Sequence, residues 1–233
     1  MKLSVSIIIP AFNEAENLTL LIENILNQKN LFSDMEIIVV DDFSNDKTNL
    51  IMKSFQKNKE ILYLKNNYRS GQSKSISNGI RKSKYNNIIT IDGDGQNDPN
   101  DFSILVKEYN FDQSYLISGI RKTRKDTPIK IFSSKVANFV RSLILKDNCE
   151  DSACGLKLFS KDIFLKINFF DGMHRFLPAL FIAYGVKPVY VTINHKPRMK
   201  GESKYGTTDR LIKGLLDLYR VKKMIKKINN NKC

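Results

Sequence analysis

Four short runs rich in isoleucine and valine alternate with amphipathic stretches through the first half of the chain. Strands of this composition suit a sheet that is covered on both faces, and parallel strands need a crossover, usually a helix, between them. The alternation therefore predicts an α/β fold with a mostly parallel central sheet flanked by helices. The expected strands are residues 4–10, 35–41, 61–65 and 88–92.

Capping signals mark where the helices of this pattern begin. They place Asn13 before a helix over 16–28, Asn45 or Asp46 before one over 47–57, and Pro99 before one over 101–109. The remaining expected elements are a strand at 115–119, helices at about 128–145, 161–167 and 176–184, a strand at 188–195, and a basic helix at 208–228.

A chain of 233 residues with 42% hydrophobic content can bury one substantial core. We therefore expect a single domain over residues 1–228 and a disordered tail over 229–233. No apolar run approaches the ~20 residues that span a bilayer, and the first residues lack the layout of a signal peptide, so we expect a cytoplasmic protein. The cysteines are odd in number and lack a metal-ligand spacing, which favours reduced thiols. They are Cys149, Cys154 and Cys233.

The net charge of +14 is unevenly distributed. Residues 1–119 carry 13 basic and 15 acidic side chains, whereas residues 120–147 carry 8 and 2, and residues 196–232 carry 12 and 3. Such basic stretches attract nucleic acid, anionic lipid headgroups or diphosphates. A solvated lysine-rich surface explains the charge equally well, so charge alone leaves the partner open.

Polar residues follow three of the expected strands, at residues 10–14, 41–42 and 92–98. In open parallel sheets, ligands bind beyond the carboxyl ends of the strands. Asp92 and Asp94 are two residues apart, and the glycine between them lets a diphosphate approach the backbone. This pair is typical of a Mg²⁺ or Mn²⁺ site that bridges protein and diphosphate. An ordinary turn or helix cap is the alternative for any one of these clusters.

Three segments together resemble family 2 glycosyltransferases: IIIPAFNE at 7–14, VVDDFSNDKT at 39–48 and DGDGQNDP at 92–99. The chain looks most similar to the dolichyl-phosphate mannose synthase group of polyprenyl-phosphate glycosyltransferases, from Val5 to about Tyr205. The resemblance implies a GT-A fold, with a nucleotide-sugar half over about 1–119 and an acceptor half over about 120–207.

The resemblance also implies a donor site. Its nucleoside pocket would be lined by Pro10, Phe12, Glu14 and Asp42 and closed by Gly71 and Gln72. Asp92 and Asp94 would hold the metal, with Gln96 as a further ligand or diphosphate contact. A covering loop after His195 would offset the charge of the departing nucleotide through Arg198 and Lys204, and its Ser203 would contact the acceptor phosphate. For His195 itself we expect a structural or diphosphate-orienting role.

An acceptor-phosphate site is implied in the second half. Arg121, in a segment similar to the Gly-Ser-Arg of the family but with Ile120 in place of serine, would grip the acceptor phosphate. Lys130 and Ser134, or Ser133 in its place, fall near a second phosphate-binding pair of the family. Lysine there keeps the charge but loses the bidentate fork of arginine.

Asp151 begins the segment DSACGLK at 151–157, which resembles a stretch near the reacting sugar in the family. It is the one evident candidate for a general base. A sugar hydroxyl acceptor needs a base, whereas a phosphate monoester, with a second pKa of about 6, is already largely anionic. Asp151 would otherwise orient the sugar or the phosphate-binding residues, or simply cap a turn.

Apolar residues from Leu211 to Ile228 recur at helical spacing among lysines and arginines. Such a helix binds a membrane surface, or it packs on the domain with its lysines in water. Many relatives carry transmembrane helices after this point, and this sequence shows no apolar run of that length. We therefore expect either peripheral attachment or a membrane-protein partner.

The sequence thus predicts an inverting transferase that moves a mannose- or glucose-type sugar from a GDP- or UDP-sugar to a polyprenyl phosphate at the cytoplasmic face of the membrane. The residues expected to carry catalysis are Asp94, Arg121, Asp151 and Arg198. One alternative is transfer to a sugar hydroxyl in cell-surface polysaccharide or lipopolysaccharide synthesis. A nucleic-acid-binding module ranks lowest, because no nucleic-acid motif is present and paired aspartates repel phosphates without a metal.

Overall fold

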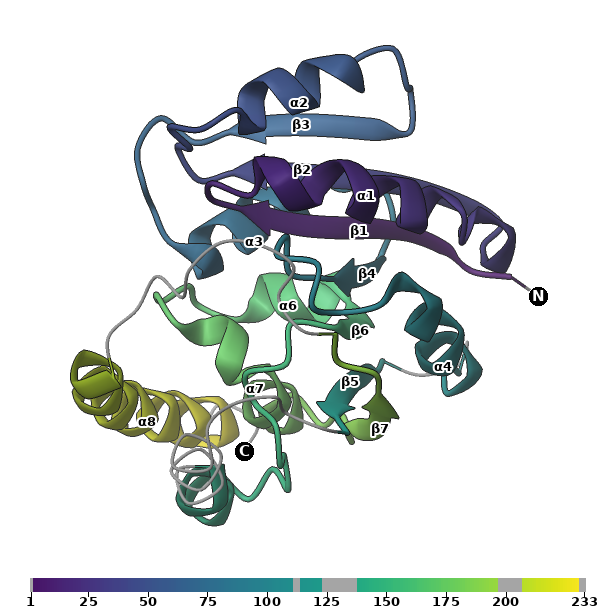
Figure 1. The fold of residues 1–233 in the computed structure, drawn as a ribbon. Coiled ribbons are helices and arrows are strands. Elements are labelled where there is room, and N and C mark those ends of the chain that lie inside the picture. Colours follow the sequence, from purple (N-terminus) through teal and green to yellow (C-terminus); the bar gives the residue numbers. More distant parts are fainter. Residues whose placement is uncertain (1, 111–113, 123–137, 197–206, 231–233) are drawn as a thin grey trace.

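The computed structural model of the protein describes residues 2–110, 114–122, 138–196 and 207–230. Within them, one sheet of seven strands runs in the order β3-β2-β1-β4-β6-β5-β7 (Figure 1). Only β6 pairs antiparallel to its neighbours, so the expected mostly parallel sheet is confirmed. The strands are β1 (Ser4–Ala11), β2 (Asp34–Asp41), β3 (Ile61–Lys65), β4 (Asn87–Thr90), β5 (Leu116–Arg121), β6 (Lys157–Ser160) and β7 (Val189–Ile193).

Helices cover both faces of the sheet. One face packs against α1 (Ala15–Leu26), α2 (Thr48–Ser54) and α4 (Phe102–Lys107). The other packs against α3 (Gln72–Lys82), α6 (Lys161–Lys166), α7 (Leu177–Ala183) and α8 (Thr207–Asn230). Short 3-10 helices stand at η1 (Lys29–Leu31), η2 (Pro99–Asp101) and η3 (Met173–Arg175), and residues 138–145 are helical.

The alternation of side chains along β1 divides the core into these two layers. Ile7 and Ile9 point to the α1 face, whereas Ile8 points to the α3 face, as the two-residue period of a strand requires. A Cβ at Gly79 would lie 2.7 Å from Cγ2 of Ile8, so this glycine lets α3 approach β1 closely. The position of α3 matters because its first turn reaches the ends of the strands.

One helix was expected without bounds, and one strand is absent from the sequence-based expectation. The helix α3 is polar in composition, and Ser73, Ser75 and Ser77 on its buried side hide the apolar pattern. The strand β6 has only four residues and lies antiparallel between β4 and β5. The alternation of strand and helix predicts a helix between the strands at 61–65 and 88–92, which α3 is, but it does not predict β6.

Element boundaries also differ from the expectation. The helix α1 begins after Glu14 rather than with an Asn13 cap, because the side chain of Asn13 accepts a hydrogen bond from the amide of Asn45 in the next loop. The described part of the helix expected at 128–145 is helical over 138–145. The helix α8 continues to Asn230, two residues into the tail that was expected to be disordered.

The apolar stripe of α8 packs against the domain rather than outward. Leu218 and Val221 are buried in the cluster that contains α7, and Ile225 packs against it. Of the two arrangements expected for this helix, packing on the domain therefore holds for these residues, since helix packing removes their apolar surface from solvent. No described helix is both long and apolar enough to cross a bilayer.

Candidate active site

Backbone contacts bring the carboxyl ends of three strands together. The amide of Asp42, after β2, donates to the carbonyl of Ala11 at the end of β1 with an N–O distance of 2.8 Å. Gly93, after β4, lies so close to β1 that a Cβ there would be 3.0 Å from the carbonyl oxygen of Pro10. The polar residues that follow these strands therefore share one edge of the sheet, where ligands of parallel sheets bind.

The loops after β1 and β2 contain two non-glycine residues in the left-handed region. Asn13 has φ 55° and Phe43 has φ 64°. Hydrogen bonds between the loops hold this conformation: the Asn13 amide donates to Oγ of Ser44 at 2.9 Å, and the Asn45 amide donates to Oδ1 of Asn13 at 3.0 Å. Such conformations persist where neighbouring structure fixes them, and they are frequent in binding loops.

The carboxylate of Asp42 is held by three N–H donors. Oδ1 accepts from Nδ2 of Asn66 at 2.9 Å and from the amide of Ser70 at 2.7 Å, and Oδ2 accepts from the amide of Gly71 at 2.8 Å. Gly71 has φ 86°, a conformation that glycine adopts without strain. The two residues predicted for one pocket, Asp42 and Gly71, are thus in contact, and nothing in the sequence singled out Asn66.

Phe12 and Glu14 are fixed beside these loops. The guanidinium of Arg69 lies over the ring of Phe12, 4.0 Å from its centroid, in a cation–π contact. The carboxylate of Glu14 accepts from Nδ2 of Asn17 at 2.8 Å, and its amide donates to Oγ1 of Thr48 at 3.2 Å. Phe12 therefore lies at the same edge as Asp42, with a cation over its face.

Asp92 is confined between α3 and the segment before β6. Nε2 of Gln72 donates to its Oδ1 at 2.8 Å, and a Cβ at Gly155 would lie 2.3 Å from its carboxyl carbon. Burial, together with the negative charge of Asp94, raises the pKa of Asp92 to about 7. Since Gly71 contacts Asp42 and Gln72 contacts Asp92, the predicted nucleoside and metal residues are joined through the first turn of α3.

Asp92 and Asp94 fit a divalent cation. Oδ1 of Asp94 accepts from the backbone amide of Gln96 at 3.2 Å, so Gln96 contacts this loop through its main chain. Across the described residues, no three His, Cys, Asp or Glu side chains form a complete ligand set. Two carboxylates leave coordination positions for water and phosphate oxygens, as Mg²⁺ and Mn²⁺ prefer.

Lys157 places a buried positive charge near this pair. It is only 3% exposed on β6, and its ammonium donates to the carbonyl of Cys154. Its charge is one of those that lower the pKa of Asp92 against the effect of burial. The sequence motif at 151–157 included Lys157, but no role was predicted for it. Burial raises the pKa of Cys154 to about 11, so this residue is a thiol at neutral pH.

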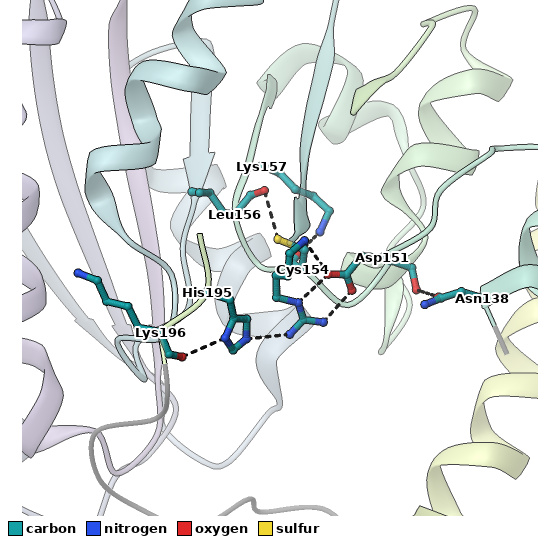
Figure 2. A network of polar contacts seen from close by, with 9 residues as sticks. Asn138, Asp151, Cys154, Leu156, Lys157, His195 and Lys196 are labelled. Carbon is teal, nitrogen blue, oxygen red and sulfur yellow. Dashed lines mark hydrogen bonds and ion pairs between the residues drawn. The ribbon is translucent and has the colours of Figure 1, made fainter. Parts of the chain in front are cut away.

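Arg121 and Asp151 form a bidentate ion pair. Nε of Arg121 lies 2.6 Å from Oδ2 of Asp151, and Nη2 lies 2.7 Å from Oδ1. Burial alone would lower the pKa of Arg121, but the hydrogen bonds and charge of Asp151 outweigh it and raise that pKa. Ser152 donates to Oδ1 of Asn138 at 2.8 Å, which ties this segment to the helix at 138–145 (Figure 2).

His195 borders the same guanidinium. Its Nε2 lies 3.4 Å from Nη1 of Arg121, and its Nδ1 lies 2.9 Å from the carbonyl oxygen of Lys196 (Figure 2). Burial, followed by the positive charge of Arg121, lowers the pKa of His195 below its ordinary value. The ring is therefore neutral at physiological pH.

Five of the expected site residues lie outside the part of the chain that the structure describes. They are Lys130, Ser134, Arg198, Ser203 and Lys204. The remaining expected residues occur at one edge of the sheet or at the adjoining end of β5. Gly155 and Lys157 are site residues that the sequence analysis did not predict. Both belong to the motif at 151–157, which is the sequence signal that could have identified them.

Comparison with known proteins identifies the family. The family model described as glycosyl transferase family 2 matches residues 6–167. A dodecaprenyl-phosphate galacturonate synthase of Rhizobium johnstonii is 32% identical over 230 residues, covering 94% of this chain and 67% of that protein. An undecaprenyl-phosphate 4-deoxy-4-formamido-L-arabinose transferase of Photorhabdus laumondii is 32% identical over 218 residues, covering 92% and 66%. The chain spans about two thirds of the length of these relatives.

Solved structures share the fold at low identity. Glucosyl-3-phosphoglycerate synthase from Mycobacterium tuberculosis, in complex with Mn²⁺, UDP and phosphoglyceric acid, superimposes with a TM-score of 0.70 at 15% identity, over 92% of this chain and 78% of that one. Mannosyl-3-phosphoglycerate synthase from Rubrobacter xylanophilus gives 0.65 at 15% identity, over 99% and 74%. At such identity the likeness shows the fold alone. By its family match and its fold, the chain belongs to glycosyl transferase family 2 and is a GT-A glycosyltransferase.

Proposed function

We propose that this glycosyltransferase moves a sugar from a nucleotide diphosphate to a polyprenyl phosphate at a membrane surface. The observation that carries the acceptor assignment is the bidentate pair between Arg121 and Asp151. A carboxylate engaged on both oxygens by a guanidinium is a poor general base, because proton transfer to it would break the ion pair. The same ion pair holds the guanidinium of Arg121 in one orientation, and a planar guanidinium is well suited to bind a phosphate.

The relatives support the same acceptor class. The similar proteins are named as a dodecaprenyl-phosphate and an undecaprenyl-phosphate sugar transferase. The sugars in those names are galacturonate and 4-deoxy-4-formamido-L-arabinose, so a mannose- or glucose-type donor stays a proposal. An isoprenoid phosphate is the feature that the names share.

The donor would bind along the edge formed by β1, β2 and β4. Asp92 and Asp94 would hold Mg²⁺ or Mn²⁺, which, when bound, neutralises charge on the diphosphate leaving group. Gln72 would keep Asp92 oriented, and Lys157 would offset part of the negative charge of the two aspartates. Pro10, Phe12 and Glu14 would lie along the nucleoside.

The hydrogen bonds already made by Asp42 favour uridine over guanosine in this pocket. An ionised carboxylate offers about four acceptor positions, and three of those of Asp42 are used by Asn66, Ser70 and Gly71. Uracil presents a single ring N–H between two carbonyls. Guanine presents adjacent ring and amino N–H groups that would need two acceptors. We therefore propose a UDP-sugar as the donor class.

The reaction would be a single inverting displacement. The acceptor phosphate is already anionic near neutral pH, so no residue has to remove a proton from it. Arg121 would hold that phosphate opposite the leaving diphosphate, and the enzyme would act mainly by positioning and by electrostatic stabilisation. Asp151 would keep the guanidinium in a fixed orientation.

A membrane surface would be reached through the helix at 138–145. Phe139 and Leu143 are 69% and 68% exposed, and Leu216 and Tyr219 on α8 are 66% and 72% exposed. The helix carries Asn138, whose side chain accepts from Ser152 beside Asp151. Apolar side chains next to basic ones bind anionic lipid surfaces, so this side of the protein would bring Arg121 to a lipid-linked acceptor. The alternative is that a membrane-protein partner covers these exposed apolar side chains.

The acceptor assignment is tested with undecaprenyl phosphate and undecaprenol in matched detergent micelles. UDP-sugars are first screened for thermal stabilisation with Mn²⁺, because a ligand that binds only the folded state raises the melting temperature. The best donor is then offered with each lipid. We expect Mn²⁺-dependent transfer to the phosphate and none to the alcohol. Transfer to undecaprenol or to an oligosaccharide hydroxyl, with none to the phosphate, would overturn the proposal.

A further inference from the structure

The imidazole of His195 lies between two groups of opposite hydrogen-bonding character. Its Nδ1 lies 2.9 Å from the carbonyl oxygen of Lys196, which can only accept (Figure 2). Its Nε2 lies 3.4 Å from Nη1 of Arg121, which can only donate. A neutral ring satisfies both neighbours in one tautomer, with the proton on Nδ1 and the lone pair on Nε2.

The backbone that carries His195 is fastened to the segment that follows Asp94. The amide of Lys196 donates to the carbonyl of Gln96 at 2.9 Å, and a β-bridge joins Asn97 to His195. Nζ of Lys196 lies 2.7 Å from Oδ2 of Asp98. Residues 195–196 are therefore held to residues 92–98, the proposed metal loop that carries Asp92 and Asp94, by main-chain and side-chain contacts together.

The same fastening continues one residue earlier. The amide of Asn194 donates to Oδ2 of Asp101 at 2.8 Å, and its Nδ2 donates to Oδ1 at the same distance. These bonds fix the end of β7 against η2. The position of the half-buried His195 ring is thus set by the metal loop and η2.

Arg121 receives its other contacts from a different part of the chain. Asp151 takes Nε and Nη2, and Ser152 beside it donates to Asn138 of the helix at 138–145. The guanidinium is therefore held from one side by the segment linked to that helix and from the other by His195. His195 is the residue whose hydrogen-bond contact, within the described part of the chain, links the guanidinium to the segment after Asp94.

We propose that His195 is a positioning residue: through Nε2 it sets the orientation of Arg121 relative to the metal loop, and so the distance between acceptor phosphate and donor. This inference rests on the proposed role of Arg121 in binding that phosphate. The side chain acts through Arg121 and has no bond to make or break. Its effect is on the acceptor, whereas the donor contacts of Asp42, Gln72 and Asp92 lie elsewhere.

Three substitutions separate this role from packing. His195→Gln places an amide oxygen near the position of Nε2 and keeps an acceptor for Arg121. His195→Asn reaches only as far as Nδ1 and keeps the contact to Lys196 instead. His195→Phe retains the ring volume and loses both. Steady-state kinetics with undecaprenyl phosphate gives the KM for acceptor, and calorimetry with Mn²⁺ and UDP gives the donor-side Kd.

We expect His195→Asn and His195→Phe to raise the KM for undecaprenyl phosphate roughly tenfold, since a hydrogen bond to a charged group is lost. His195→Gln should stay within about threefold of the parent, and the Kd for UDP with Mn²⁺ should be unchanged in all three. Equal losses in all three variants, accompanied by weaker UDP binding, would show a merely structural role and overturn the inference. So would an unchanged KM throughout.

A spectroscopic measurement tests the tautomer without any substrate. The chain has only two histidines, so the imidazole signals lost in His195→Phe identify His195 in long-range ¹H–¹⁵N spectra. We expect a protonated Nδ1 and an unprotonated Nε2 at pH 7.5. A protonated Nε2 would overturn the inference.

Arg121→Ala distinguishes a failure of the proposed acceptor site from a failure of the positioning role of His195. If this variant keeps the parental KM for undecaprenyl phosphate, the proposed acceptor site fails. If it raises that KM while the His195 variants do not, only the role of His195 fails.

Discussion

Gly155 and Asp92 touch so closely that no larger residue fits at position 155. A Cβ there would meet the carboxyl carbon and both carboxylate oxygens of Asp92 at 2.3–2.4 Å. The carbonyl of Gly155 also accepts from Oγ1 of Thr90 at 2.7 Å, which fixes the segment against the end of β4. The glycine of the 151–157 motif therefore defines where one of the two proposed metal ligands can lie.

Gly155→Ala should displace Asp92 and weaken Mn²⁺ binding, because the carboxylate has to leave the position that the glycine allows. We expect a loss of at least about tenfold in Mn²⁺ affinity and a destabilisation of about 1–3 kcal/mol from overpacking. Calorimetry and urea unfolding measure the two effects. Gly214→Ala is the matched control, because a Cβ there meets no atom within 4 Å. Parental Mn²⁺ affinity in Gly155→Ala would contradict the account.

Asp92→Asn should make the metal-free protein more stable at alkaline pH. The pKa of Asp92 is raised from 3.8 to about 7, so the folded state binds the proton more tightly than the unfolded state. Stability therefore falls as pH rises from about 4 to about 7, and the penalty is fully present above 7. We expect Asp92→Asn to gain roughly 4 kcal/mol relative to the parent at pH 8 and less than half of that at pH 5.

Thermal unfolding in EDTA at pH 5 and pH 8 measures this difference. Adding Mn²⁺ should stabilise the parent at pH 8 and leave Asp92→Asn unchanged. A variant that is less stable than the parent at pH 8 without metal would show that Asp92 is not destabilised by its surroundings. Equal differences at both pH values would contradict the raised pKa.

Asp151→Asn separates an orienting carboxylate from a general base. If Asp151 holds Arg121, the loss should appear mainly in the KM for undecaprenyl phosphate, by about tenfold, because an amide makes a weaker contact with the guanidinium. The pH profile of kcat should keep its shape. Loss of nearly all activity, together with removal of an acid limb from the parental profile, would instead assign Asp151 as the base for a hydroxyl acceptor.

Much of the proposed donor site, at the edge formed by β1, β2 and β4, could be predicted because it depends on local sequence signals. Strands β1, β2 and β4 are apolar runs, and Asp42, Asp92 and Asp94 follow them directly, so strand order was not needed to expect them together. The expectation of a nucleotide-sugar ligand came from the family resemblance. The structure adds that Gln72 and Gly155 enclose Asp92.

The second half was less predictable because its contacts join distant segments. Arg121 contacts Asp151, which lies thirty residues further along the chain, and His195, which lies seventy-four residues further along. The pairing of β6 with β5 accompanies the first contact, and a four-residue strand has too little pattern to be recognised. The second contact follows from the parallel pairing of β5 with β7, in which Arg121 lies opposite Ile193. The apolar stripe of α8 was ambiguous for a related reason: periodicity indicates a buried face but not what covers it.

Vesicle binding should depend on the exposed apolar side chains of the helix at 138–145. Phe139→Ser together with Leu143→Ser should weaken partitioning onto phosphatidylglycerol-containing vesicles at least about tenfold, since each buried apolar side chain contributes about 1.5–3 kcal/mol. Sedimentation with vesicles at two salt concentrations measures it. Leu50→Ser, a 62% exposed residue on α2, is the control. An equal effect of the control and the double variant would remove this surface from the account.

The most direct test of the account is calorimetric titration of UDP into the protein with and without Mn²⁺, for the parent and for Asp94→Asn. If Asp92 and Asp94 hold the cation that carries the diphosphate, UDP should bind the parent only with Mn²⁺. Asp94→Asn should weaken that binding about a hundredfold, whereas Asp34→Asn, at an exposed position on β2, should leave it unchanged. Equally tight UDP binding without metal, or to Asp94→Asn, would contradict the central claim.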